Sequence, residues 1–99
     1  MTDTTIAKTI LEQLGGKRFR VMTGTHGLMA HPNALSMRLR RNQAGAMYLK
    51  ITLDPSDTYT MEFTRSRGTE LIPVETVDGI YFDQLQEIFT RVTGLVTTL

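Results

Sequence analysis

The chain of 99 residues is 40% hydrophobic and 21% charged, with a formal net charge of +1. This length and composition are typical of one globular domain, which we predict over residues 1–99 and whose core needs no cross-link. The absence of cysteine excludes disulfides, thiolate catalysis and cysteine-ligated zinc. No apolar run reaches the ~18–20 residues of a membrane span, and the N-terminus lacks the basic start and apolar block of a signal peptide, so we expect a cytoplasmic protein with no membrane partner.

The first predicted element is a helix that Thr4 or Thr5 caps at its start and that Gly15-Gly16 ends. Glycine takes the left-handed conformation at a helix end without penalty. The apolar face of this helix consists of residues at helical spacing, Ile6, Ile10, Leu11 and Leu14.

Four segments that follow this helix alternate between apolar and polar residues, which is typical of strands with one buried face. They are RFRV at 18–21, LSMRLRR at 35–41, MYLKITL at 47–53 and YTMEFTR at 59–65. A DPSD turn joins the last two, because Pro55 presets the backbone for a turn. A fifth segment, ELIPVETV, contains Pro73, which cannot donate to a ladder, so we expect this strand to be short or at an edge.

Helical spacing returns in residues 78–94, where Gly94 marks the predicted end of a second helix. Its apolar stripe consists of Leu85, Ile88, Phe89 and Val92, with Tyr81 one turn earlier. The predicted fold is therefore α+β: an antiparallel four- to five-stranded meander with an N-terminal and a C-terminal helix packed on one face, in the order α-β-β-β-β-(β)-α.

Both histidines lie in GTHGLMAHPNA, residues 24–34, which is predicted to be a long loop between the first two strands. Because the histidines are five residues apart and the chain has no third histidine or cysteine, the pattern indicates no metal site. No phosphate-binding, dinucleotide or nucleophile motif occurs either, so we predict no catalytic residues, no cofactor and no enzyme. Long loops often contact partners. The residues of this loop, 23–34, that we expect to bind a partner are His26, Leu28, Met29 and His31.

The charge is unevenly distributed along the chain. Residues 17–67 carry nine Lys or Arg and three acidic residues, whereas residues 68–99 carry one arginine and five acidic residues. If the first three predicted strands are neighbours, their outward positions share one face and include Arg18, Arg20, Arg38, Arg40, Tyr48 and Lys50. Single-strand nucleic-acid binders combine cations for phosphates with an aromatic ring for a base, so the pattern predicts an interface of this kind for DNA or RNA. The same pattern leaves open an ordinary solvated face, an acidic protein partner, and a homo-oligomer that uses the acidic C-terminal helix of a second copy.

Three segments, LGGKRFRVMTGTHG, YLKITLDPSDTYTMEF and GIYFDQLQEIFTRVTGL, resemble an uncharacterised family of small proteins encoded by bacteriophages and integrated prophages. The resemblance spans residues 10–99, and its most specific blocks are ITLDPSDTY and RVTGL. It implies a location in the cytoplasm of a bacterial host cell, and nucleic acid or a bacterial host or phage protein as partner. It brings no catalytic residues and no assigned activity.

Overall fold

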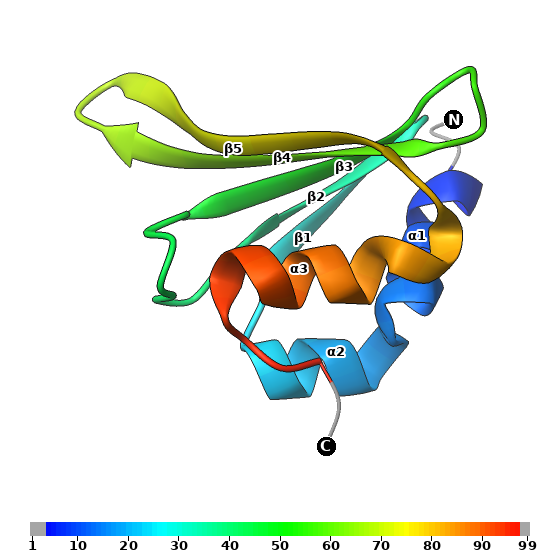
Figure 1. The fold of residues 1–99 in the computed structure, drawn as a ribbon, viewed down its shortest axis with the longest axis horizontal. Coiled ribbons are helices and arrows are strands. Elements are labelled where there is room, and N and C mark those ends of the chain that lie inside the picture. The colour runs from blue at the N-terminus through cyan, green and yellow to red at the C-terminus, as the bar shows by residue number, and fades with distance from the viewer. Residues whose placement is uncertain (1–3, 98–99) are drawn as a thin grey trace.

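The computed structural model describes residues 4–97, so residues 1–3 and 98–99 of the predicted domain lie outside the described residues. Its elements follow in the order α1 (Thr5–Leu14), α2 (Gly16–Thr23), β1 (His26–His31), β2 (Ala34–Arg38), β3 (Tyr48–Leu53), β4 (Tyr59–Arg67), β5 (Glu70–Ile80), the short 3-10 helix η1 (Phe82–Gln84) and α3 (Leu85–Thr93). The five strands form one layer, and the helices lie on one side of it, while no described element covers the other side (Figure 1).

The sheet is an antiparallel meander in the order β1-β2-β3-β4-β5, so each strand pairs with its neighbours in sequence. β5 lies at an edge, as Pro73 predicts, but it is 11 residues long rather than short. Two register shifts against β4, one within residues 73–75 and the other within residues 77–80, each add one residue to β5. Such bulges interrupt the ladder locally, which lets an edge strand continue past a proline.

The core fills the space between the inner face of the sheet and the helices. Buried strand residues alternate with more exposed ones, as a sheet with one covered face requires; the fully buried set includes Leu49, Ile51, Met61 and Phe63. The helices close this core with Ile10, Leu14, Phe19, Leu85 and Phe89. The rings of Phe19 and Phe89 meet edge to face, with centroids 5.0 Å apart and an interplanar angle of 71°.

The prediction of a first strand at residues 18–21 is wrong, because this segment lies in the helix α2. The chain turns at Gly15, whose φ is 119°, and a second helix begins at the next residue. A run of four alternating residues fits a helix as well as a strand. Burial decides between them: Phe19 is fully buried, whereas Val21, which a strand would place on the same face, is 71% exposed.

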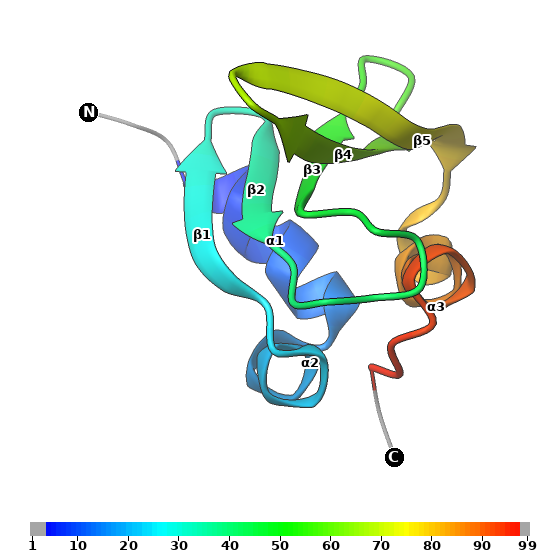
Figure 2. The same ribbon diagram turned by 90° about the vertical axis from the view of Figure 1, so that its left-hand side faces the viewer.

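The predicted loop at residues 24–34 is also wrong, because His26–His31 is the strand β1. β1 and β2 lie side by side (Figure 2) and are joined by a turn at residues 32–33, with His31 opposite Ala34. β1 therefore takes the place in the meander that the prediction gave to residues 18–21. The α+β class, the antiparallel meander, and the N-terminal and C-terminal helices on one face are confirmed. Within residues 4–97, every helix is too short or too polar to cross a bilayer.

Candidate functional site

The cations of the chain gather in one part of the sequence. Residues 13–53 contain seven Lys or Arg and neither Asp nor Glu. This segment comprises the end of α1, then α2, β1, β2, the loop that follows β2, and β3. Because no carboxylate of the segment offsets these charges, the segment carries a local excess of positive charge, which attracts anions.

The helix α2 presents Lys17 and Arg20 to solvent. It is anchored by Phe19, which is fully buried and packs against Phe89 of α3. Residues 17, 20 and 24 are spaced by three and four positions, which places Lys17, Arg20 and Gly24 along one stripe of the helix. Gly24 is the residue that caps the C-terminus of α2, so this stripe leads from the helix toward the sheet.

Two exposed arginines at the end of β2 lie across glycines of the preceding segment. A Cβ atom at Gly27 would come within 3.3 Å of Cδ of Arg38, and one at Gly24 within 2.8 Å of Cδ of Arg40. Both glycines also have φ angles, 59° and 69°, that other residues rarely adopt. The glycines therefore provide flat backbone on which the aliphatic part of each arginine rests. This contact holds Arg38 against β1 and Arg40 against the end of α2.

Hydrogen bonds fix the loop that follows β2, which runs past α2 toward α3 (Figure 2). The side-chain amide of Asn42 donates to the carbonyl oxygens of Arg40 and Ala46, at 2.8 and 2.7 Å. The backbone N–H of Gln43 donates to the carbonyl oxygen of Thr93, at 3.2 Å, which ties the loop to the end of α3. Arg40 therefore projects from a backbone that is held on both sides.

We define the basic surface as Lys17, Arg20, Arg38 and Arg40. Their sequence neighbours Arg18 and Arg41 are also exposed. Within residues 4–97, the single ion pair joins Arg91 to Glu75, at 2.8 Å, so the cations of the basic surface have no carboxylate partner there. Part of this surface is hollowed, with a volume of about 330 Å³ beside Lys17 and Arg20. The cations of the basic surface do not line one common hollow, because Lys17 and Arg20 line this one and Arg38 lines another.

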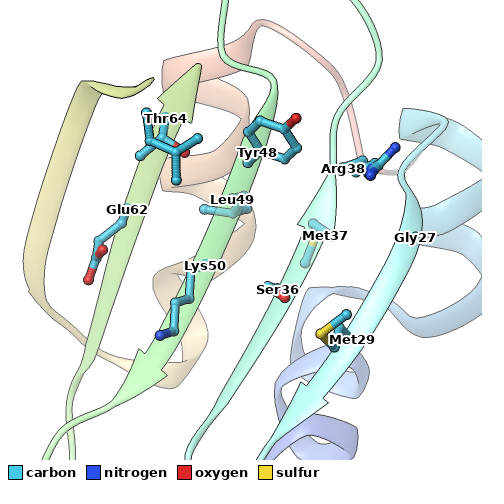
Figure 3. A pocket seen from close by; sticks show the side chains of 11 residues that line it. Gly27, Met29, Ser36, Met37, Arg38, Tyr48, Leu49, Lys50, Glu62 and Thr64 are labelled. Carbon is cyan, nitrogen blue, oxygen red and sulfur yellow. The ribbon is translucent and has the colours of Figure 1, made fainter. Parts of the chain in front are cut away.

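The uncovered face of the sheet contains a hollow of about 390 Å³, which we call the sheet-face groove. Its lining includes Met29, Arg38, Tyr48, Lys50, Glu62 and Leu71. Cross-strand register places Tyr48 opposite Arg38 and Lys50 opposite Glu62. Figure 3 shows the side chains of Tyr48, Lys50 and Glu62 on the same face of the sheet. Arg38 therefore belongs both to the basic surface and to the groove.

The predicted partner-binding residues lie on β1 instead of a loop. Leu28 packs partly against the core, whereas Met29 is 61% exposed and lines the groove. The ring of His26 is 3.2 Å from a backbone carbonyl oxygen, and Nε2 of His31 is 3.0 Å from the hydroxyl of Ser36. Among residues 4–97, no three His, Cys, Asp or Glu side chains come together in a way that could hold a metal ion.

The residues predicted to contact nucleic acid do not share one face of the sheet. Tyr48 and Lys50 lie on β3 and Arg38 on β2, and all three line the groove, while Arg40 continues beyond the end of β2. Arg18 and Arg20 are a correction: because their segment is helical, they lie on α2 and not on the sheet.

Sequence reasoning also missed four contributors to the site. Lys17 was not predicted to belong to the site, because its segment was expected to alternate like a strand and not to follow the spacing of a helix. Glu62 lies in the groove and lowers its positive charge. Gly24 and Gly27 were interpreted as loop residues, although glycines beside arginines on a paired strand are the signal that could have identified them.

A second hollow, of about 340 Å³, differs from the basic surface in its chemistry. It lies at α1 and the turn between β3 and β4, and Asp57 and Tyr59 line it together with apolar side chains. Burial raises the pKa of the Tyr59 hydroxyl above its ordinary value of 10.0, while the Gln13 side chain acts in the opposite direction and Asp57 adds to the rise. A neutral hydroxyl and a carboxylate give this hollow no attraction for phosphate.

No protein-family model, curated protein or solved structure matches the chain.

Proposed function

We propose that the protein binds nucleic acid through the basic surface, as an accessory protein of a phage or prophage in a bacterial cell. The observation that carries the proposal is the support that Gly27 and Gly24 give to Arg38 and Arg40. It holds the aliphatic parts of Arg38 and Arg40 against β1 and the end of α2, in a segment that has no acidic residue. Cations distributed over a surface favour a ligand whose negative charges repeat at intervals.

The chemistry of the four side chains supports a phosphate ligand in particular. Three of the four cations of the basic surface are arginines, which bind phosphate oxygens through two parallel hydrogen bonds. The packing of the Arg38 and Arg40 stems on glycines restricts these two side chains before binding, so they lose less side-chain freedom on binding. The cations do not enclose a single small anion, because Lys17 and Arg20 line one hollow and Arg38 lines another. A polyanion that runs across the surface satisfies all of them.

Fluorescence anisotropy with a labelled single strand of roughly 20 nucleotides, and with a duplex of the same length, tests this function. Four phosphate contacts give a slope of about −3 when log affinity for a single strand is plotted against log salt concentration. We therefore expect affinity to fall about 50-fold between about 50 and about 200 mM salt. An absence of saturable binding at about 50 mM salt would reject the proposal.

A triple variant identifies the surface that binds. Replacing Lys17, Arg20 and Arg40 by glutamine should reduce the steepness of the salt dependence by about two units, because three phosphate contacts are lost. The matched control replaces Lys8, Arg65 and Arg67 by glutamine. It removes the same charge from exposed positions outside the basic surface and should keep the slope of the unmodified protein. Equal losses in both variants would mean that net charge alone governs binding.

A second candidate function is the binding of a protein partner on the uncovered face of the sheet. The partner would be a phage protein, a host protein or a second copy of this chain. It is favoured by the exposed fractions of Met29 and Leu71, 61% and 66%, which leave two large apolar side chains in water. Sedimentation velocity over a range of concentrations tests self-association. A mass that rises with concentration, and does so less after Met29→Ser and Leu71→Ser, would support the second candidate.

A further inference from the structure

The sheet-face groove continues the basic surface, since Arg38 belongs to both. Its volume of about 390 Å³ is comparable to that of sites for small organic ligands. The groove is open along the uncovered side of the sheet, and side chains from all five strands contribute to its lining. Arg38 is therefore a cation that a ligand of the groove shares with a chain bound on the basic surface.

Tyr48 places an aromatic ring next to two cations of the groove. Arg38 is its direct cross-strand partner, and Lys50 lies two residues further along β3 on the same face. Arg38 and Lys50 are therefore diagonal neighbours, with Cα atoms roughly 7–8 Å apart. A base stacked on the ring would leave the phosphates on its two sides within reach of these two long cations.

The apolar rim of the groove fits the flat face of a base. Met29 and Leu71, which are 61% and 66% exposed, line it on strands β1 and β5. Methionine adapts its shape and makes favourable sulfur contacts with aromatic rings. A base in a duplex is already stacked on both faces and does not reach a ring at the floor of a sheet, whereas an unpaired base does.

We propose that the sheet-face groove binds one unpaired base of a single strand against Tyr48, with the flanking phosphates on Arg38 and Lys50. This inference rests on the proposed function and adds that single-stranded nucleic acid is the preferred ligand. Glu62 favours a base over an acidic protein segment, because its carboxylate repels the carboxylates of such a segment, whereas a base carries no charge.

Tyrosine fluorescence tests the stacking directly, because the chain has three tyrosines and no tryptophan. In a Tyr59→Phe, Tyr81→Phe background, Tyr48 is the only emitter. We expect a single strand of roughly 12 nucleotides to quench its emission, and an abasic strand of equal length to quench it far less. Tyr48→Leu should weaken single-strand affinity about 10-fold and duplex affinity less than twofold, whereas Tyr48→Phe should bind like the unmodified protein.

The control for these variants is Tyr81→Leu, at a tyrosine that is 60% exposed and does not line the groove. It should leave affinity for every strand unchanged. Equal affinity for the normal and the abasic strand, with the salt slope intact, would overturn the stacking and leave the basic surface as the binding site. Absence of binding to every strand would reject the basic surface as well. Tighter, Tyr48-dependent binding of a polyglutamate peptide would show that the groove serves an acidic protein segment.

Discussion

Residues 13–53 and residues 54–97 carry an excess of charge of opposite sign. The first region has seven Lys or Arg and no acidic residue, whereas the second has eight acidic residues and three arginines. The single ion pair within residues 4–97, Arg91 with Glu75, lies entirely in the second region. The net charge of +1 therefore conceals a strongly basic region beside an acidic one. Overall charge is a poor guide to what such a surface binds, since attraction at close range depends on the local potential.

The two regions nevertheless share one core, and their contacts fix the position of the basic surface. β3 of the first region pairs with β4 of the second along six residue pairs. Phe19 packs edge to face on Phe89, and the loop after β2 is bonded to Thr93. The acidic region thus supplies the support against which α2 and the arginines are held. This division predicts separate effects on stability and on binding when each is altered.

The largest expected effect is on stability and comes from removing the contact between Phe19 of the first region and Phe89 of the second. Phe19→Ala removes a fully buried ring that packs on Phe89, and we expect it to lower the free energy of unfolding by about 3–5 kcal/mol. Urea unfolding followed by far-ultraviolet circular dichroism measures this loss. Phe89→Ala should cost a similar amount, and the double variant less than the two losses together, because the rings share one contact.

The matched control is Val21→Ala, on the same helix but 71% exposed, which should change the free energy of unfolding by less than about 0.5 kcal/mol. If Phe19→Ala does not fold, Phe19→Leu keeps most of the buried volume and gives a smaller loss of the same sign. A loss below about 1 kcal/mol for Phe19→Ala would show that α2 is held by other contacts.

The second prediction separates backbone strain from the support of an arginine. Gly24→Ala and Gly68→Ala place a Cβ atom at φ angles of 69° and 63°, so each should cost about 1–2 kcal/mol of stability. Only at Gly24 does the new atom meet a side chain, Cδ of Arg40 at 2.8 Å, because nothing lies within 4 Å at Gly68. Displacing Arg40 removes one phosphate contact, which weakens single-strand affinity about fivefold at about 0.1 M salt.

Unfolding and anisotropy measurements on the same two variants check this prediction. The expected result is similar stability but unequal affinity. Equal affinities would show that Arg40 binds as well when it leaves Gly24, and the glycine would then serve only the turn at the end of α2.

Most of the fold could be predicted because its signals are local and repeated. The alternation in β3 and β4 extends over six or more residues, which is too long to fit a helix. The apolar stripe of α3 is at regular helical spacing, which does not fit a strand. Residues 18–21 gave only four positions, which fit both spacings, and the contact of Phe19 with a ring 70 positions away decided the outcome. That contact is tertiary, and it overrides a short local preference.

The candidate site was predictable in composition but not in arrangement. The excess of cations in the middle of the chain is visible in the sequence, and so are Arg38, Tyr48 and Lys50 on alternating positions. The approach of Arg38 to Gly27 and of Arg40 to Gly24 depends on the register of β1 with β2, which no local pattern fixes once β1 is assigned to a loop.

The smallest predicted effect concerns Glu62, the one acidic side chain among residues 4–97 that lines the groove. Its carboxylate repels a phosphate that reaches Lys50, its cross-strand partner. At a separation of about 7 Å in water this repulsion is about 0.5 kcal/mol, so Glu62→Gln should tighten single-strand binding about two- to threefold. The gain should shrink as salt is added, because the charge is exposed. Glu87→Gln makes the same change of charge on α3, outside the groove, and should leave affinity unchanged.

If Glu62→Gln instead weakens binding to strands rich in cytosine while tightening binding to abasic strands, the carboxylate is a hydrogen-bond acceptor for the base. The boundary between the basic and the acidic region would then be part of the site itself.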